Sequence, residues 1–346
     1  MAPEDTLRLV ATGIARFGSF AAHAVLFGIV PALILVLRPA FAELPDSADP
    51  GRREAAGRVA GFVVAALALS AVCTGVVLVL QANLVAEFSG EQMTAGSFGG
   101  VFETPFGRWH LLRVPLLVGL TVLLVGRVEL WSLPRATTDG RVAARGWWVM
   151  WIVLGTSLLA TTTFSGHSVV ASPRALAQAN DLVHLLAGSI WFCGVLSLAL
   201  VVPRAWTGMD EDQRLALLAP AVMRFSRVAA VAIAVVTLTG IVNSLLHVGG
   251  LGDLTGTAYG RSLAIKLLFF LGVLVVGGIN HFVLRARLQR AREDPTSSDA
   301  RRLFRKTIAV ELALGLAIFA ATAALTGSAR TKQLARSEAS AVRPNR

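Results

Sequence analysis

The sequence predicts an all-α integral membrane protein, a bundle of about eight transmembrane helices with both termini on the outer side. Of its 346 residues, 55% are hydrophobic and only 15% are charged, whereas soluble domains carry ~25% charged residues. Apolar runs long enough to cross the ~30 Å hydrocarbon core as helices recur along the whole chain. Backbone groups in lipid must be satisfied internally, and the runs exceed the ~10 residues of a barrel strand, so we expect helices.

The apolar runs define the elements in order, separated by short polar stretches rich in turn residues. The longest gap, 83–109, has the composition of a loop with room for a short interfacial helix. We expect an N-terminal half of four helices over 1–165, a C-terminal half over 166–330 and a basic, disordered tail over 331–346. The predicted spans are 16–37, 58–82, 110–131, 147–165, 180–202, 222–247, 261–284 and 307–327.

The net charge of +11 reflects topology, because basic residues are concentrated in alternate loops. Cytoplasmic loops of membrane proteins carry an excess of Lys and Arg, so the basic loops are predicted to be cytoplasmic and both termini outside. The basic C-terminal tail disagrees with this pattern, but it is outweighed by the alternation of seven loops. We expect membrane lipid as a partner of this protein, and we do not expect nucleic acid. The basic loops contain Arg38, Arg52, Arg53 and Arg58; Arg127, Arg135, Arg141 and Arg145; Arg204, Arg214, Arg224 and Arg227; and Arg285, Arg287, Arg290, Arg292, Arg301, Arg302, Arg305 and Lys306.

Five of the six histidines fall in the outer half of the predicted bundle or at its outer edge. Ionisable side chains within membrane spans are costly and default to functional hypotheses. Asp181 precedes one of these histidines by three residues, so both can share a helix face, and a carboxylate can fix an imidazole tautomer for metal binding. Imidazole suits copper, zinc, iron and nickel, so the residues alone favour a transition metal without choosing one, and haem iron is equally compatible. The predicted metal ligands are His167, His184, Asp181, His23, His110 and His247.

Three further polar groups lie inside the spans. Asn243 is predicted to orient a ligand or the Lys266 side chain, since an unpaired amide in an apolar medium is costly. Lys266 and Glu311 lie at different depths, which argues against a direct ion pair between them. Cys73 and Cys193 are in separate apolar spans without a paired spacing, so neither a disulfide framework nor a thiolate zinc site is predicted.

An ordered set of motifs resembles the copper-resistance D family (CopD/PcoD type). Cys193 replaces the first glycine of the family's Trp-x-Gly-Gly pattern, which either adds a soft ligand or alters packing. His23, His110 and His247 have no clear counterpart, whereas Trp191, Asn243, Tyr259, Lys266 and Glu311 match family positions and are expected to support the site. The motifs are Phe164-Ser165-Gly166-His167, Asn180-Asp181-Leu182-Val183-His184-Leu185-Leu186, Ile190-Trp191-Phe192-Cys193-Gly194, Met223-Arg224-Phe225-Ser226-Arg227, Leu238-Thr239-Gly240-Ile241-Val242-Asn243 and Thr257-Ala258-Tyr259-Gly260.

The resemblance implies a multi-pass protein of the bacterial cytoplasmic (inner) membrane that handles copper ions, importing them from the outer face through a histidine-lined entrance. A periplasmic or extracytoplasmic copper-binding protein is the implied partner. Two alternatives remain: a haem-binding membrane redox protein, and an assembly factor that delivers copper to another membrane complex. The sequence shows neither a phosphate-binding Gly-rich loop nor a nucleophile elbow, so we do not expect an enzyme.

Overall fold

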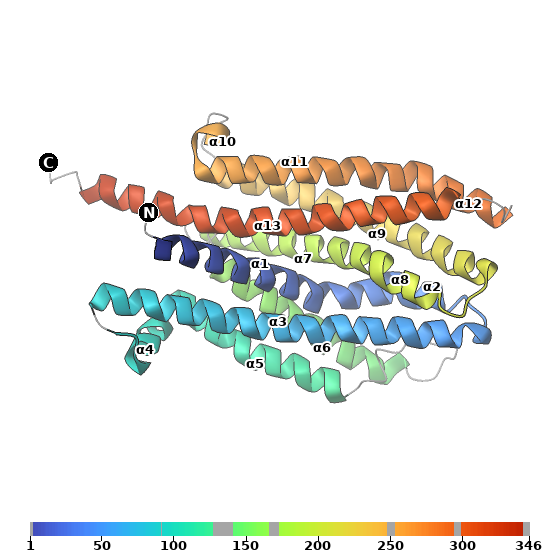
Figure 1. Cartoon of the computed structure of the whole chain (residues 1–346), viewed down its shortest axis with the longest axis horizontal. Coiled ribbons are helices and arrows are strands. Elements are labelled where there is room, and N and C mark those ends of the chain that lie inside the picture. The colour runs from blue at the N-terminus through green and yellow to red at the C-terminus, as the bar shows by residue number, and fades with distance from the viewer. Residues whose placement is uncertain are drawn as a thin grey trace.

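The computed structural model describes residues 3–90, 92–126, 141–165, 173–247, 253–293 and 299–341, and these residues form helices with no strand. Eight of the helices are long and apolar enough to cross a membrane, as the sequence predicted. They run side by side along the long axis, and both chain ends lie at the same end of the bundle (Figure 1). That end also carries α4 and α10 and is called here the α4–α10 end; the opposite one is the α8–α12 end.

The first four spans include the central helix. The chain begins with α1 (Pro3–Ala32), which continues through the π-helical segment η1 (Leu33–Leu37) into α2 (Arg38–Phe41). A short 3-10 turn, η2 (Asp46–Ala48), leads into α3 (Asp49–Ser89). The gap predicted over 83–109 contains the short helix α4 (Ala95–Glu103), and α5 (Pro105–Gly126) and α6 (Arg141–Phe164) follow.

The last four spans repeat the pattern of long helices with interruptions. Helix α7 (Arg174–Leu196) runs through the π-helical η5 (Ser197–Val201) into α8 (Val202–Ala205). After α9 (Glu211–His247) and α10 (Asp253–Gly256), α11 (Ala258–Ile279) runs through the π-helical η6 (Asn280–Leu284) into α12 (Arg285–Glu293). The chain finishes with α13 (Asp299–Ala341).

Helix α1 is the centre of the bundle. It packs against α3 and α6 on one side and against α7 and α13 on the other. Trp151 of α6 donates its indole N–H to the carbonyl oxygen of Leu26 at 2.7 Å, which ties a fully buried ring to α1. Helices α5 and α6 pair beside this core, as do α7 with α9 and α11 with α13. The first span thus joins the two predicted halves.

Small residues allow α1 and α7 to approach closely. A Cβ atom added to Gly28 would lie 2.3 Å from the carbonyl oxygen of Ser189 and 2.9 Å from Cys193 Sγ. The Cys193 thiol is fully buried and donates to the carbonyl oxygen of Ala24 at 3.3 Å. Of the two roles considered for Cys193, the structure supports packing, because small residues at helix contacts are how membrane helices associate.

The outward faces of the helices are apolar. Large aliphatic side chains on α3, α5, α9 and α11 are exposed at the protein surface, among them Val72, Val118, Leu238 and Leu268. Such a continuous apolar exterior would be an aggregation hazard in water, whereas lipid chains solvate it. The exterior therefore fits a multi-pass membrane protein.

The helices extend further than the apolar runs that predicted them. Helix α7 begins at Arg174, six residues before the predicted start, so His184 lies nearly three turns into the helix instead of one. At the other end of the chain, α13 runs to Ala341, past the end of the predicted span at 327. Ala, Lys, Arg, Gln and Glu dominate this tail and are good helix formers, so the end of the apolar run does not end the helix.

Candidate metal site

Polar side chains of α7, α9 and α11 meet at the α4–α10 end in what we call the His184 cluster: Asn180, Asp181, His184, Thr239, Asn243, Tyr259 and Lys266. Asn180 and Asp181 precede His184 on α7 by four and three residues, and Thr239 and Asn243 are four residues apart on α9, so the members of each such pair lie on one helix face. Asn180 joins the two helices by donating its amide to the carbonyl oxygen of Thr239 at 2.9 Å and to Asn243 Oδ1 at 2.8 Å. Asn243 therefore faces Asn180 of α7, and its predicted role of orienting a ligand or Lys266 stays a prediction.

Thr239 determines the tautomer of His184. The Thr239 hydroxyl lies 2.6 Å from the carbonyl oxygen of Val235, a separation that requires the hydroxyl proton between the two oxygens. Its single proton is thereby committed, so toward His184 Nδ1, 2.9 Å away, the hydroxyl can only accept. Nδ1 then carries the hydrogen and Nε2 presents its lone pair. A neutral imidazole held in one tautomer by a hydrogen bond to its other nitrogen is the usual form of a protein metal ligand.

The charges of the His184 cluster are balanced. Lys266 interacts electrostatically with both His184 and Asp181, and Asp181 also interacts with Tyr259. A lysine ammonium beside His184 opposes the approach of a cation, and the carboxylate of Asp181 offsets that charge. The sequence argued against a direct ion pair between Lys266 and Glu311. In the structure Glu311 Oε1 accepts a hydrogen bond from the Asn280 amide at 3.1 Å.

His23 belongs to a different cluster, on the other side of α1. Its ring is fully buried, with Nδ1 3.0 Å from the hydroxyl of Thr162 on α6 and Nε2 2.9 Å from the hydroxyl of Ser70 on α3. Both ring nitrogens are occupied, so His23 has no free lone pair for a metal. Its hydrogen bonds connect α1 to two neighbouring helices.

His110 lies near His23, on α5. Its Nδ1 donates to the carbonyl oxygen of Phe106 at 2.9 Å, and its ring lies 4.0 Å from the Phe106 ring, centre to centre. The buried Arg113 interacts electrostatically with both histidines and donates to Thr161 Oγ1 at 2.9 Å. A guanidinium so close opposes a metal cation, which makes this cluster a poorer metal site than the one around His184.

The predicted outer histidines are thus divided between two clusters. His167 lies outside the described residues, and for His247 the structure describes only the backbone, as the last residue of α9. Among the described side chains, no three His, Cys, Asp or Glu residues are grouped so that they could hold a metal ion. The histidine pair predicted from the sequence therefore remains a prediction.

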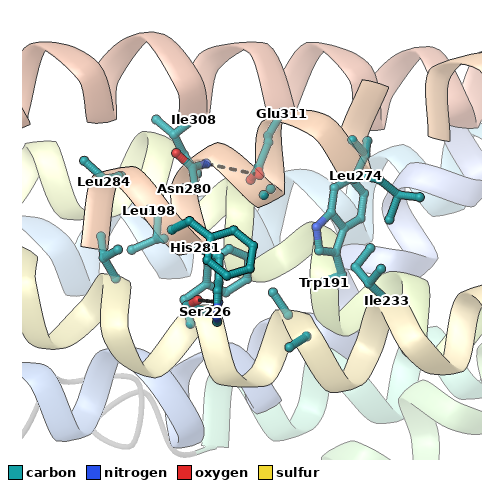
Figure 2. A pocket seen from close by; sticks show the side chains of 18 of the residues that line it. Trp191, Leu198, Ser226, Ile233, Leu274, Asn280, His281, Leu284, Ile308 and Glu311 are labelled. Atoms are coloured by element: carbon teal, nitrogen blue, oxygen red, sulfur yellow. Dashed lines mark hydrogen bonds between the residues drawn. The ribbon is translucent and has the colours of Figure 1, made fainter. Parts of the chain in front are cut away.

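Trp191 and Glu311 do not belong to the His184 cluster. Both line a cavity of about 290 Å³ bounded by α7, α9, α11 and α13 (Figure 2). The sequence reasoning grouped them with the outer site because they match family positions, but their places in the fold separate them. It passed over Asn180 and Thr239 as ligand-positioning residues, although their spacing of four residues from His184 and Asn243 is a readable helix-face signal.

Comparison with known proteins places this chain in a family of membrane proteins named for copper resistance. Residues 6–173 match the family described as "Copper resistance protein D-like, N-terminal domain", and residues 219–325 match "Copper resistance protein D". The chain belongs to the copper resistance protein D family.

Two curated proteins are similar to this chain. One is "Copper transport protein CutJ" of Bacillus subtilis (strain 168), 27% identical over 226 residues, which is 65% of this chain and 37% of that protein. The other is "Copper resistance protein D" of Pseudomonas syringae pv. tomato, 28% identical over 215 residues, or 61% of this chain and 64% of that protein. The chain thus spans less than two thirds of the length of either relative. No solved structure matches it.

Proposed function

We propose that this protein imports copper across the bacterial cytoplasmic membrane, with the α4–α10 end and both termini facing outward. The observation that carries the proposal is the geometry of His184, whose Nδ1–H is held by Thr239 so that Nε2 is left as a ligand at that end. For an imidazole-containing site, copper(II) is the most strongly bound of the common divalent metals of the first transition row. The names of the two relatives, one for copper transport and one for copper resistance, point to the same cargo.

His167 is the proposed second ligand, with Asp181 as an additional oxygen ligand or a partner of an imidazole. His184 lies ten residues into α7, about 15 Å from the helix start at a rise of ~1.5 Å per residue. The seven residues from His167 to Arg174 span up to ~23 Å when extended. That connection is long enough to return His167 to the level of His184, as the proposal requires. An extracytoplasmic copper-binding protein would supply the ion at this end.

Uptake of isotope-labelled copper into proteoliposomes tests the proposal. Wild-type protein and the Thr237→Ala control should take up copper, and His184→Ala should lose most of the uptake. Thr237 is a suitable control because its hydroxyl bonds only within α9, to the carbonyl oxygen of Ile233 at 2.8 Å. Wild-type vesicles that accumulate no more copper than protein-free vesicles would contradict transport. A Soret band in the purified protein would favour the haem alternative.

A further inference from the structure

The cavity toward the α8–α12 end holds a carboxyl group in apolar surroundings. Glu311 of α13 is 3% exposed and projects between η6 and Trp191 (Figure 2). The lining is mostly aliphatic and aromatic, with a few polar side chains among it. These are Ser226 of α9, Asn280 and His281 of η6, and Glu311 itself.

Two oxygen atoms in this cavity lack a partner. Glu311 Oε1 accepts from the Asn280 amide at 3.1 Å, but Glu311 Oε2 and Asn280 Oδ1 are buried without a hydrogen bond. An ionised carboxylate with one neutral hydrogen bond and no cation would cost several kcal/mol in such a place. A proton on Oε2 removes the charge, so the geometry favours the protonated acid.

No neighbouring charge alters this balance. The lining comes from α7, η5, α9, α11, η6 and α13, and among its described residues only Glu311 and His281 have ionisable side chains. Helix α1 also packs against α13 but contributes no residue to the lining. His281 Nδ1 is 2.7 Å from the Ser226 hydroxyl, which ties that ring to α9.

The backbone around Glu311 is irregular and roomy. Asn280 and His281 begin the π-helical segment η6, and single π turns within α-helices are frequent at functional sites. A Cβ atom on Gly277 would lie 3.5 Å from Glu311 Oε1, so a larger side chain there would crowd the carboxyl group. The fold thus leaves space beside the Glu311 carboxyl group, whose Oε2 has no hydrogen-bond partner.

We propose that Glu311 is a proton-binding site of the transport cycle, holding a proton on Oε2 and releasing it when a copper ion passes through the cavity. The proton leaves to water at the α8–α12 end, and the carboxylate left behind offsets the charge of the ion. When the ion departs, Oε2 takes up a proton again from the α4–α10 side, so one proton crosses with each ion and the carboxylate offsets one of the ion's positive charges. The coupling rests on the proposed copper transport, whereas the resting protonation of Glu311 does not.

Infrared spectroscopy of the full-length protein in vesicles tests the resting state. Wild-type protein should show the carbonyl stretch of a protonated carboxylic acid, shifted in D₂O, and Glu311→Gln should lose it. Gln is nearly isosteric and keeps an acceptor for Asn280, so folding should be preserved. Asp181→Asn removes a carboxyl group of the His184 cluster and should leave the band in place. A band unchanged in Glu311→Gln, or absent from wild type, would overturn the assignment.

Copper uptake into vesicles containing a pH-sensitive dye tests the coupling. Wild-type uptake should be accompanied by a copper-dependent change in internal pH. In Glu311→Gln that change should disappear while copper binding at the His184 cluster persists. An equal pH change in wild type and Glu311→Gln would overturn the coupling even if copper transport stands. Absence of uptake by wild type would overturn the coupling together with the proposed function, and the infrared band would still assign the proton to Glu311.

Discussion

The hydrogen bond from His184 to Thr239 gives the sharpest test of the candidate metal site. Replacing Thr239 by Val keeps the shape of the side chain but removes the acceptor that holds the Nδ1 hydrogen 2.9 Å away. The imidazole then loses its hydrogen bond to the hydroxyl and keeps only the one to the Val236 backbone, and loss of such a partner by a buried group costs up to ~1–3 kcal/mol. At ~1.4 kcal/mol per tenfold change, this corresponds to a loss of roughly fivefold to a hundredfold in copper affinity. Measured losses on removing such supporting partners of metal ligands are ~10–100-fold.

The matched variant is Thr239→Ser, which retains the hydroxyl and loses only a methyl group. Copper affinity would be measured by competition with a chelator of known affinity, on purified protein in detergent or nanodiscs. Thr239→Ser should bind within a few fold of wild type, and Thr239→Val should bind at least ~10-fold more weakly. Equal affinities for the Val and Ser variants would refute the claim that Thr239 prepares His184 for copper.

Three further predictions follow from other parts of the fold. His23→Phe removes the hydrogen-bond partner of the Ser70 and Thr162 hydroxyls, at a cost of ~1–3 kcal/mol each. Thermal stability should therefore fall, while the folded protein keeps its copper affinity. Weakened copper binding would instead place His23 among the ligands. Gly28→Ala places a methyl group against the Ser189 carbonyl and should destabilise the protein by ~1–3 kcal/mol. The control Gly188→Ala, whose methyl group would meet nothing within 4 Å, should leave stability unchanged. Equal thermal stabilities of the two variants would contradict the close approach of α1 and α7. A reporter inserted in 294–298 should be cytoplasmic and one in 171–173 extracytoplasmic; reversed labelling of both would invert the proposed topology.

Hydropathy alone predicted the spans of this fold, because each crossing needs a long apolar run and the polar connections are short. It did not predict where the helices end, since residues such as those of 331–341 favour helix without being apolar. The π-helical segments were also missed. Nothing in the composition of Ser197–Val201 or Asn280–Leu284 distinguishes them from ordinary helix.

The sequence indicated at which end of the bundle the candidate-site histidines lie, but neither their depth in the helices nor their arrangement. Counting along the spans brought His23, His110 and His184 to one end of the bundle. Which helices are neighbours depends on packing, and the central α1 separates the cluster of His23 and His110 from that of His184. The role of Thr239 depends on two hydrogen bonds that no spacing rule specifies.

Copper uptake by proteoliposomes containing wild type, His184→Ala, His167→Ala or the double variant tests the central claim most directly. We predict that wild type accumulates labelled copper, that each single variant loses most of this activity, and that the double variant is no worse than the weaker single one. That non-additivity is expected if both imidazoles bind the same ion. Undiminished uptake by the double variant, inserted at wild-type levels, would contradict the histidine entrance.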